Sequence, residues 1–236
     1  MPGVNWTEVL YSAKKRFVIF LGFLFAGFSV FWFLADGIIE NIKAHLLPEQ
    51  AEMIVTSPME YVLVKLEISL IFAALTALPI FVVMVIKRLK IRINWISAAI
   101  WLSLAALLFL FGFFFTYFLL LPITIQVLTK LATDVDILPF YSISQFVLFA
   151  ILTTLVFSIV FDLPVVISWL AINGYVEVES LKKWRKGVYV IIFVVSAIIT
   201  ADPTPLTQVL LSIPLIILYE ASIISAKIFG KKSVSA

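Results

Sequence analysis

The chain has 236 residues, of which 63% are hydrophobic and 13% charged, and its formal net charge is +3. Soluble domains are about 45–50% apolar, so this composition excludes a water-soluble globular fold and indicates an all-α integral membrane protein. The chain has no cysteine and one histidine, and it contains no Gly-x-Ser-x-Gly or Walker motif, so we expect neither an enzyme nor a metal or cofactor site. Nor do we expect a nucleic-acid partner.

The N-terminal part predicts one membrane span between two amphipathic helices. Apolar residues recur at helical spacing within 1–16, which predicts a helix on the membrane surface. The first span follows at 17–35, and it is too long for a cleaved signal peptide. An acidic outer loop follows at 36–60, with an amphipathic helix at 38–47 that Pro48 ends.

The second span is predicted at 61–86, and a short basic loop follows at 87–92. Two ionisable side chains, Lys65 and Glu67, lie near the outer end of this span. They are two residues apart and face different sides of a helix, so they do not form a simple helical ion pair. We expect Lys65 to extend outward and Glu67, which is deeper, to face protein.

The third span is predicted at 95–121 and is ended by Pro122. A second outer loop covers 122–144, and the fourth span covers 145–172. Asn173-Gly174 ends the fourth span as a C-cap pair does.

Asp162 and Pro164 lie inside the fourth span. A carboxylate at the bilayer centre costs about 2.5–3.5 kcal/mol on insertion scales. Proline two residues later removes a backbone N–H and its ring presses on the carbonyl of Val160. Irregular backbone at this depth persists only where protein or a water-filled cavity surrounds it, so we expect Asp162 to face protein rather than lipid.

The last two spans are predicted to be short. The fifth apolar run, 187–201, has 15 residues, or ~22 Å of helix, against a hydrocarbon core of ~30 Å. The Asp202-Pro203-Thr204-Pro205 turn precedes the sixth run at 206–226, which contains Glu220.

Basic residues assign the topology. Three lie in 14–16, four in 87–92, four in 182–186 and three in 227–232, which is 14 of the 17 in the chain. By the positive-inside rule this predicts six spans with both termini on the inner side.

Four ionisable residues lie within the predicted spans: Lys65, Glu67, Asp162 and Glu220. Such residues are candidates for function, and the alternative is that they pair within the bundle and fix its packing. Glu220 is close enough to the basic C-terminal tail for partial solvation.

Several motifs resemble one known family. They are Thr56-Ser57-Pro58-x-Glu60 followed by Lys65, Phe115-x-Tyr117-Phe118 with Pro122, Phe161-Asp162-x-Pro164, Asp202-Pro203-x-Pro205-x-Thr207-Gln208, Ile213-Pro214 and Tyr219-Glu220. In this order and spacing they are similar to the TatC family, the receptor core of the twin-arginine protein translocase. The resemblance covers nearly the whole chain.

The resemblance implies a single six-helix, cup-like domain over 1–236 in the cytoplasmic (cell) membrane. It implies binding of twin-arginine signal peptides on the inner face, recruitment of single-span TatA/TatB-like partners, and passage of folded cargo driven by the proton-motive force. Membrane lipid and a homo- or hetero-oligomer are further expected partners. An intramembrane partner site would contain Asp162, Pro164, Glu67, Lys65, Gln208 and Glu220.

The sequence departs from the family at the expected signal-peptide site. The family's arginine-binding acids fall on Ser12 and on or near Asn94. Guanidinium groups prefer carboxylates, so Glu8, which shares a helix face with Ser12, is the candidate substitute. Together with the family's basic positions, Lys14 and Arg16, these residues form the expected signal-binding surface.

Three alternatives stay open from the sequence. One is a divergent translocase paralogue that does not read the signal, which the missing acids favour. Another is a small-solute or ion secondary transporter, which broken helices and buried acids also suit, although the two halves show no inverted repeat. The third is a purely structural membrane scaffold.

Overall fold

The computed structural model describes the backbone of residues 6–229 except 90–94, 135, 137 and 200–204, and the side chains of these residues except 6–17, 19, 78–98 and 229. The chain forms two compact units. Unit 1 comprises 1–45 and 55–93, and unit 2 comprises 46–54 and 94–236. Each unit is described by itself.

Unit 1 consists of two long helices. Helix α1, Trp6–Leu46, has 41 residues, and α2, Glu60–Leu89, has 30. The expected surface helix, first span and outer amphipathic helix are therefore one continuous helix, and the prediction of three separate elements is wrong. The change from apolar to polar residues at Asp36 alters the environment of the helix, but no proline lies inside α1 to break its hydrogen bonds.

Helices α1 and α2 pack through small residues. Gly27 lies against Ala73, and a Cβ added to Gly27 would come within 3.4 Å of the Cα of Ala73. Phe31 and Phe72 stack beside this contact with ring centroids 5.2 Å apart. Close backbone approach at glycine and alanine is the usual way in which membrane helices gain van der Waals contact.

Unit 2 begins with a helical run that crosses Pro122. It comprises α3 (Trp95–Phe115), a π-helical turn η1 (Thr116–Leu120) and α4 (Leu121–Thr133). The expectation that Pro122 ends the third span and opens a loop is wrong. The backbone hydrogen-bond pattern changes just before the proline, where the N–H of Leu121 donates to the carbonyl of Thr116, five residues back. The proline then falls in the first turn of α4, where a missing N–H is tolerated.

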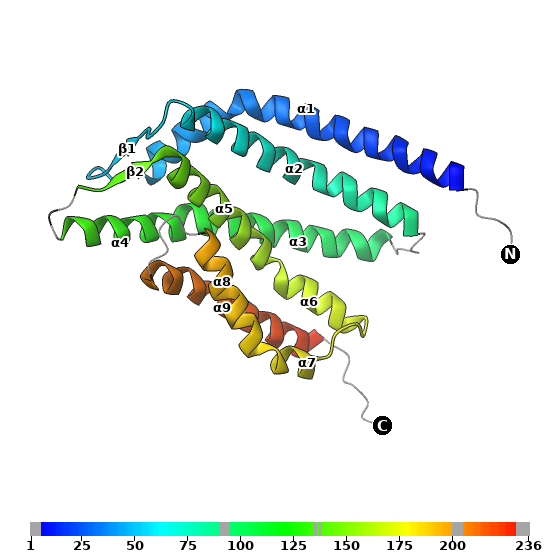
Figure 1. Ribbon diagram of the computed structural model, residues 1–236. Helices are drawn as coiled ribbons and strands as arrows, with labels where there is room; N and C mark the ends of the chain where they lie inside the picture. Colours follow the sequence, from blue (N-terminus) through cyan, green and yellow to red (C-terminus); the bar gives the residue numbers. More distant parts are fainter. Residues whose placement is uncertain (1–5, 90–94, 135, 137, 200–204, 230–236) are drawn as a thin grey trace. The chain divides into compact units, whose positions relative to one another are not determined.

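Most of the rest of unit 2 is helical (Figure 1). Its helices are α5 (Ile143–Phe161), α6 (Leu163–Ile172), α7 (Val178–Lys183), α8 (Arg185–Ile199) and α9 (Pro205–Phe229). Helix α8 has 15 residues, as expected for a short fifth span. Helix α9 has 25, so the expectation of a short sixth span is wrong. It extends the predicted run by Pro205 at its start and by Lys227, Ile228 and Phe229 at its end, and Pro214 lies inside it.

Unit 2 also contains one small sheet, which an all-α prediction omits. Strand β1, Glu52–Ile54, pairs in parallel with β2, Phe140–Ser142, with Met53 opposite Tyr141. The two strands lie next to each other in Figure 1. Their partners are far apart in the sequence, so no local pattern reveals the pairing.

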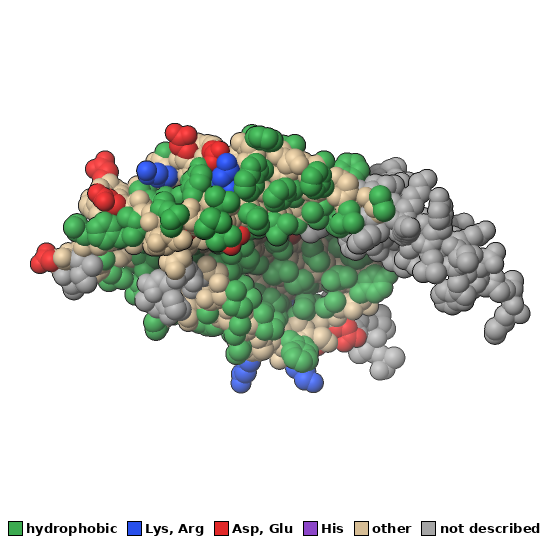
Figure 2. All heavy atoms as spheres, turned by 45° about the horizontal axis from the view of Figure 1, so that its top comes forward, with side chains coloured by type: hydrophobic (Ala, Val, Ile, Leu, Met, Phe, Trp, Pro, Cys, Tyr) green, Lys and Arg blue, Asp and Glu red, His purple; other side chains and the backbone are tan. Residues whose placement is uncertain are grey.

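Among the described residues, four helical stretches are long and apolar enough to cross a membrane: Phe20–Leu46, Ala99–Thr133, Ile143–Ile172 and Pro205–Ile228. Figure 2 shows one face of the molecule, on which hydrophobic side chains cover most of the described surface. Lipid is the solvent that matches such a surface. The chain is therefore a multi-spanning helical membrane protein.

Candidate functional site

The fourth predicted span is interrupted at Asp162. Helix α5 ends at Phe161 and α6 begins at Leu163, so Asp162 is the junction between them. Its N–H donates to the carbonyl of Ile159 over 3.1 Å, in the tighter three-residue pattern. Pro164 lies in the first turn of α6, where backbone N–H groups have no acceptor within the helix, so the N–H that proline lacks costs no hydrogen bond. The sequence predicted irregular backbone hydrogen bonding at this point, and the structure confirms it, because α5 and α6 are separate helices.

The carboxylate of Asp162 lacks a partner at one oxygen. Its Oδ1 is buried and makes no hydrogen bond to any described residue. Leaving a buried polar atom unpaired costs about 1–3 kcal/mol, more when the group is charged. The junction thus holds an acceptor that is available to water or to a polar group from another chain.

Glu67 in unit 1 also has a carboxylate oxygen without a hydrogen-bond partner in the described part of the chain. Its Oε2 is buried and has no hydrogen-bond partner among the described residues. Glu67 lies on α2 in unit 1 and Asp162 in unit 2, so the expectation that both belong to one intramembrane partner site stays a prediction.

Lys65 is engaged within unit 1. Its Nζ lies 2.8 Å from Oδ2 of Asp36 on α1 and 5.2 Å from the ring centroid of Trp32. The hydroxyl of Tyr61 donates to the other carboxylate oxygen of Asp36. The Lys65 side chain is 15% exposed and reaches Asp36, the first residue of the predicted outer loop. That it extends toward the outer face of the membrane stays a prediction. Sequence reasoning placed Asp36 in a loop and therefore missed the pair.

We expect Lys65→Met to lower the thermal unfolding midpoint of the purified protein, because Asp36 then loses its ion pair. The Asp36 side chain is 54% exposed, so a moderate shift is expected. Asp36→Asn should give a similar shift, and the double variant should be no less stable than the worse single variant. Additive losses in the double variant would contradict coupling between the two residues.

Glu220 ties α8 to α9. Its Oε2 accepts from the guanidinium of Arg185 over 2.6 Å, and its Oε1 accepts from the hydroxyl of Tyr189 over 2.6 Å. Its side chain is 31% exposed, in accord with partial solvation, but both oxygens are occupied. The contacts favour the packing role that the sequence left open as the alternative.

The remaining predicted residues are placed less fully. Gln208 is half-buried near the start of α9, beside buried Thr207. Glu8, Ser12, Lys14 and Arg16 belong to the first part of α1, and their side chains lie outside the described part of the chain. Asn94 lies outside the described residues altogether.

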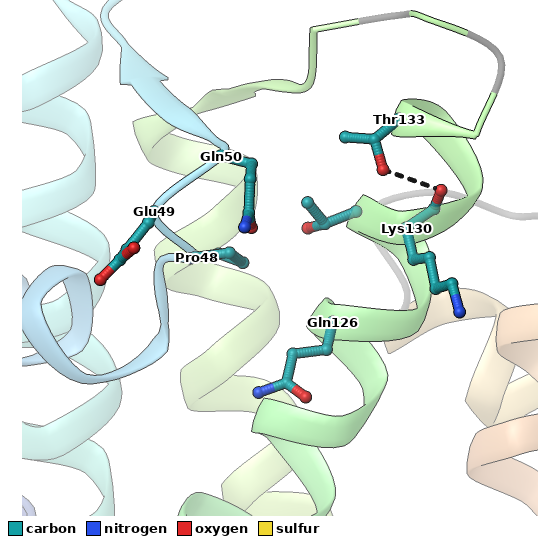
Figure 3. A pocket seen from close by; sticks show the side chains of 7 residues that line it. Pro48, Glu49, Gln50, Gln126, Lys130 and Thr133 are labelled. Atoms are coloured by element: carbon teal, nitrogen blue, oxygen red, sulfur yellow. Dashed lines mark hydrogen bonds between the residues drawn. The ribbon is translucent and has the colours of Figure 1, made fainter.

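Unit 2 contains an open pocket of about 520 Å³ that the sequence did not reveal. It is lined by Pro48, Glu49, Gln50, Gln126, Thr129, Lys130 and Thr133. In Figure 3 the amide groups of Gln50 and Gln126 point into the gap from its two sides. Thr129 is held by a 3.0 Å hydrogen bond to Tyr141 of β2. One side of the pocket is a single face of α4, which the sequence spacing shows: Gln126, Thr129, Lys130 and Thr133. The other side is the segment 48–50, which is distant in sequence, so the sequence could not predict the pocket.

Comparison with known proteins finds one family over most of the chain. The family model described as "Sec-independent protein translocase protein (TatC)" matches residues 8–214. The Sec-independent protein translocase protein TatC of Aquifex aeolicus is 30% identical over 232 residues, covering 96% of each chain. The TatC of Desulforapulum autotrophicum is 32% identical over 241 residues, covering 98% of this chain and 87% of that protein.

A solved structure agrees with the sequence comparisons. The crystal structure titled as the twin-arginine translocase receptor TatC superposes with a TM-score of 0.79 at 29% identity. The match covers 93% of this chain and 98% of that one. Both the sequence and the fold therefore agree over almost the full length, and the chain belongs to the Sec-independent protein translocase protein (TatC) family.

Proposed function

We propose that this protein is the receptor component of a twin-arginine translocase, which binds twin-arginine signal peptides and organises single-span partners to export folded proteins. The observation that carries the proposal is the agreement of sequence and fold with TatC proteins over almost the whole chain. The proton-motive force would supply the energy, so this chain needs no catalytic site.

The proposed topology has six spans with both termini on the cytoplasmic side of the cell membrane. Helix α2, with 30 residues, and α8, with 15, would supply the two spans beyond the four recognised by length and apolarity. The distribution of 14 of the 17 basic residues on one side supports this orientation. A single cup-like domain over 1–236 is part of the same proposal.

The signal-binding surface would lie at the start of α1 and in the loop after α2. Two guanidinium groups need carboxylates, and Glu8 is the acid on the face that also carries Ser12. Lys14 and Arg16 would border this surface, and Asn94 would lie at its edge, with an amide that cannot pair with a guanidinium as a carboxylate does. The absence of acids at positions 12 and 94 also favours the second candidate function, a paralogue that shapes the translocase without reading signals.

The intramembrane partner site would centre on Asp162. Its unpaired, buried Oδ1 supports this role, because a polar group from a partner helix or a trapped water would satisfy it. Pro164 breaks the helix beside it. Gln208 on α9 would belong to the same site in unit 2, and Glu220 would support it through its pair with Arg185. In unit 1, Glu67 is a separate candidate because its Oε2 is unpaired among the described residues, and Lys65 is paired with Asp36.

The test is peptide binding by the purified full chain together with its copurified single-span partners. We expect binding of a twin-arginine signal peptide but not of its twin-lysine version, because lysine cannot make the bidentate contacts of arginine. A photoreactive residue at position 8, but not at 94, should crosslink to the peptide. Copurification of the partners without any peptide crosslink would support the paralogue, and failure of both would contradict the translocase assignment.

A further inference from the structure

Phe161, the last residue of α5, is seated against α3 at a single glycine. A Cβ added to Gly112 would lie 2.8 Å from the Cβ of Phe161 and 2.9 Å from its Cγ and Cδ2. Cβ atoms do not approach other heavy atoms so closely. The nearest atom is next to the backbone of α5, so rotation of the Phe161 side chain cannot relieve the clash. The two helices can pack as they do only because residue 112 has no side chain.

Aromatic residues on α3 enclose the same side chain. The ring of Phe161 lies 5.5 Å from that of Phe111 and 5.4 Å from that of Phe115, measured between centroids. Phe161 is 8% exposed. One turn of α3 therefore forms a notch that holds the side chain of Phe161, immediately before Asp162. The notch consists of Phe111, Gly112 and Phe115.

The π-helical turn fixes the direction of this notch. Ile123 is three helical turns beyond Gly112, so in a regular helix it would continue the buried face. Instead Ile123 is 46% exposed and Thr124 is 1% exposed. The extra residue in η1 thus rotates α4 relative to α3, and α3 can present Gly112 to α5 while α4 buries a different face. Thr116 anchors the start of η1 by donating its hydroxyl to the carbonyl of Gly112 over 2.8 Å.

We propose that Gly112 is a positioning residue that fixes the depth and direction of the α5–α6 junction and thereby holds the carboxylate of Asp162 in place. This inference rests on the function proposed above for Asp162. Gly112 is itself buried against Phe161. It acts through Phe161, whose backbone continues directly into the junction.

The absence of cysteine from the chain makes the test clean, because a single introduced cysteine is the only thiol. The first measurement is the rate at which a small water-soluble maleimide labels Asp162→Cys in the full chain in membranes. Adding Gly112→Ala should raise this rate by about tenfold, because overpacking displaces the end of α5. Gly22→Ala is the matched control, since nothing lies within 4 Å of a Cβ added there, and it should leave the rate unchanged.

A second cysteine position separates a local shift from general loosening. Ser158 is fully buried one turn before Asp162. Ser158→Cys should stay unreactive with Gly112→Ala, whereas labelling at both positions would overturn the proposal, because it would show that the helix opens as a whole.

The Phe161 side chain offers a rescue experiment. With Phe161→Gly the atoms that clash are gone, so adding Gly112→Ala should no longer change the rate at which Asp162→Cys is labelled. With Phe161→Leu the Cβ and Cγ remain, so the effect of Gly112→Ala should persist. Equal effects of Gly112→Ala in all three backgrounds would overturn the proposal.

Export by the chain that retains Asp162 distinguishes the two proposals. Loss of export together with faster labelling at position 162 supports both. Faster labelling with normal export supports the positioning by Gly112 and contradicts the role of Asp162. Unchanged labelling overturns the positioning, whatever export does.

Discussion

Asp162→Ala is expected to abolish export and to abolish the crosslink between the junction and a single-span partner. The substitution removes the one carboxylate at the α5–α6 break, where Oδ1 has no partner within the described chain. A partner group that relies on this acceptor would be left unpaired in a low-dielectric environment, which costs about 1–3 kcal/mol or more. The measurement is secretion of a twin-arginine reporter together with photocrosslinking from position 165, one turn along α6.

Two further substitutions of Asp162 refine this prediction. Asp162→Glu should keep most of the export, because the carboxylate is retained on a longer side chain. Asp162→Asn should show an intermediate effect if hydrogen bonding suffices and a full loss if negative charge is required. Normal export and crosslinking by Asp162→Ala would show that the unpaired oxygen has no role in partner binding.

Glu8→Arg is expected to weaken binding of a twin-arginine peptide by roughly 100-fold. The substitution replaces the only acid proposed to contact the peptide with a repelling charge, and a 100-fold loss of affinity corresponds to about 2.8 kcal/mol of binding free energy. The measurement is a titration of a fluorescent signal peptide against the purified chain. Glu179→Arg, which changes an exposed acid on α7 in the same way, is the matched control.

A gain of function complements this loss. Ser12→Glu should strengthen peptide binding, because it places a carboxylate one helical turn from Glu8 and at the position where the family pattern has its acid. Unchanged affinity for Glu8→Arg together with unchanged affinity for Ser12→Glu would exclude the start of α1 as the signal-binding surface. It would also favour the paralogue that does not read signals.

Features set by neighbouring residues could be predicted from the sequence. The break at Asp162 follows from an acid and a proline two residues apart, and the end of α6 follows from Gly174, whose φ is 75°. With this glycine the N–H of Tyr175 donates to the carbonyl of Leu170 over 2.9 Å, which closes the helix end. The membrane class follows from apolar runs alone, because every peptide group in lipid must be paired within its own helix.

Two helix ends that the sequence predicted, at Pro122 and at Asp36, do not exist in the structure. Pro122 does not stop the helix, because the π-helical turn moves the missing hydrogen bond to the first turn of α4, where no donor is needed. The sequence around Asp36 predicted a loop, but α1 continues through it, and Lys65 and Tyr61 on the neighbouring helix satisfy its carboxylate.

For the candidate site, too, some features follow from the sequence and others only from the contacts between helices. The sequence by itself determined the class of protein, the family resemblance and the position of the acid in the fourth span, since each depends on residue type and spacing. Only the tertiary structure decided which ionisable groups are engaged: Lys65 and Glu220 have partners on other helices, whereas oxygens of Glu67 and Asp162 have none among the described residues. The physical reason is that a charge in a membrane is stabilised by whichever group lies opposite it, and helices distant in sequence supply that group.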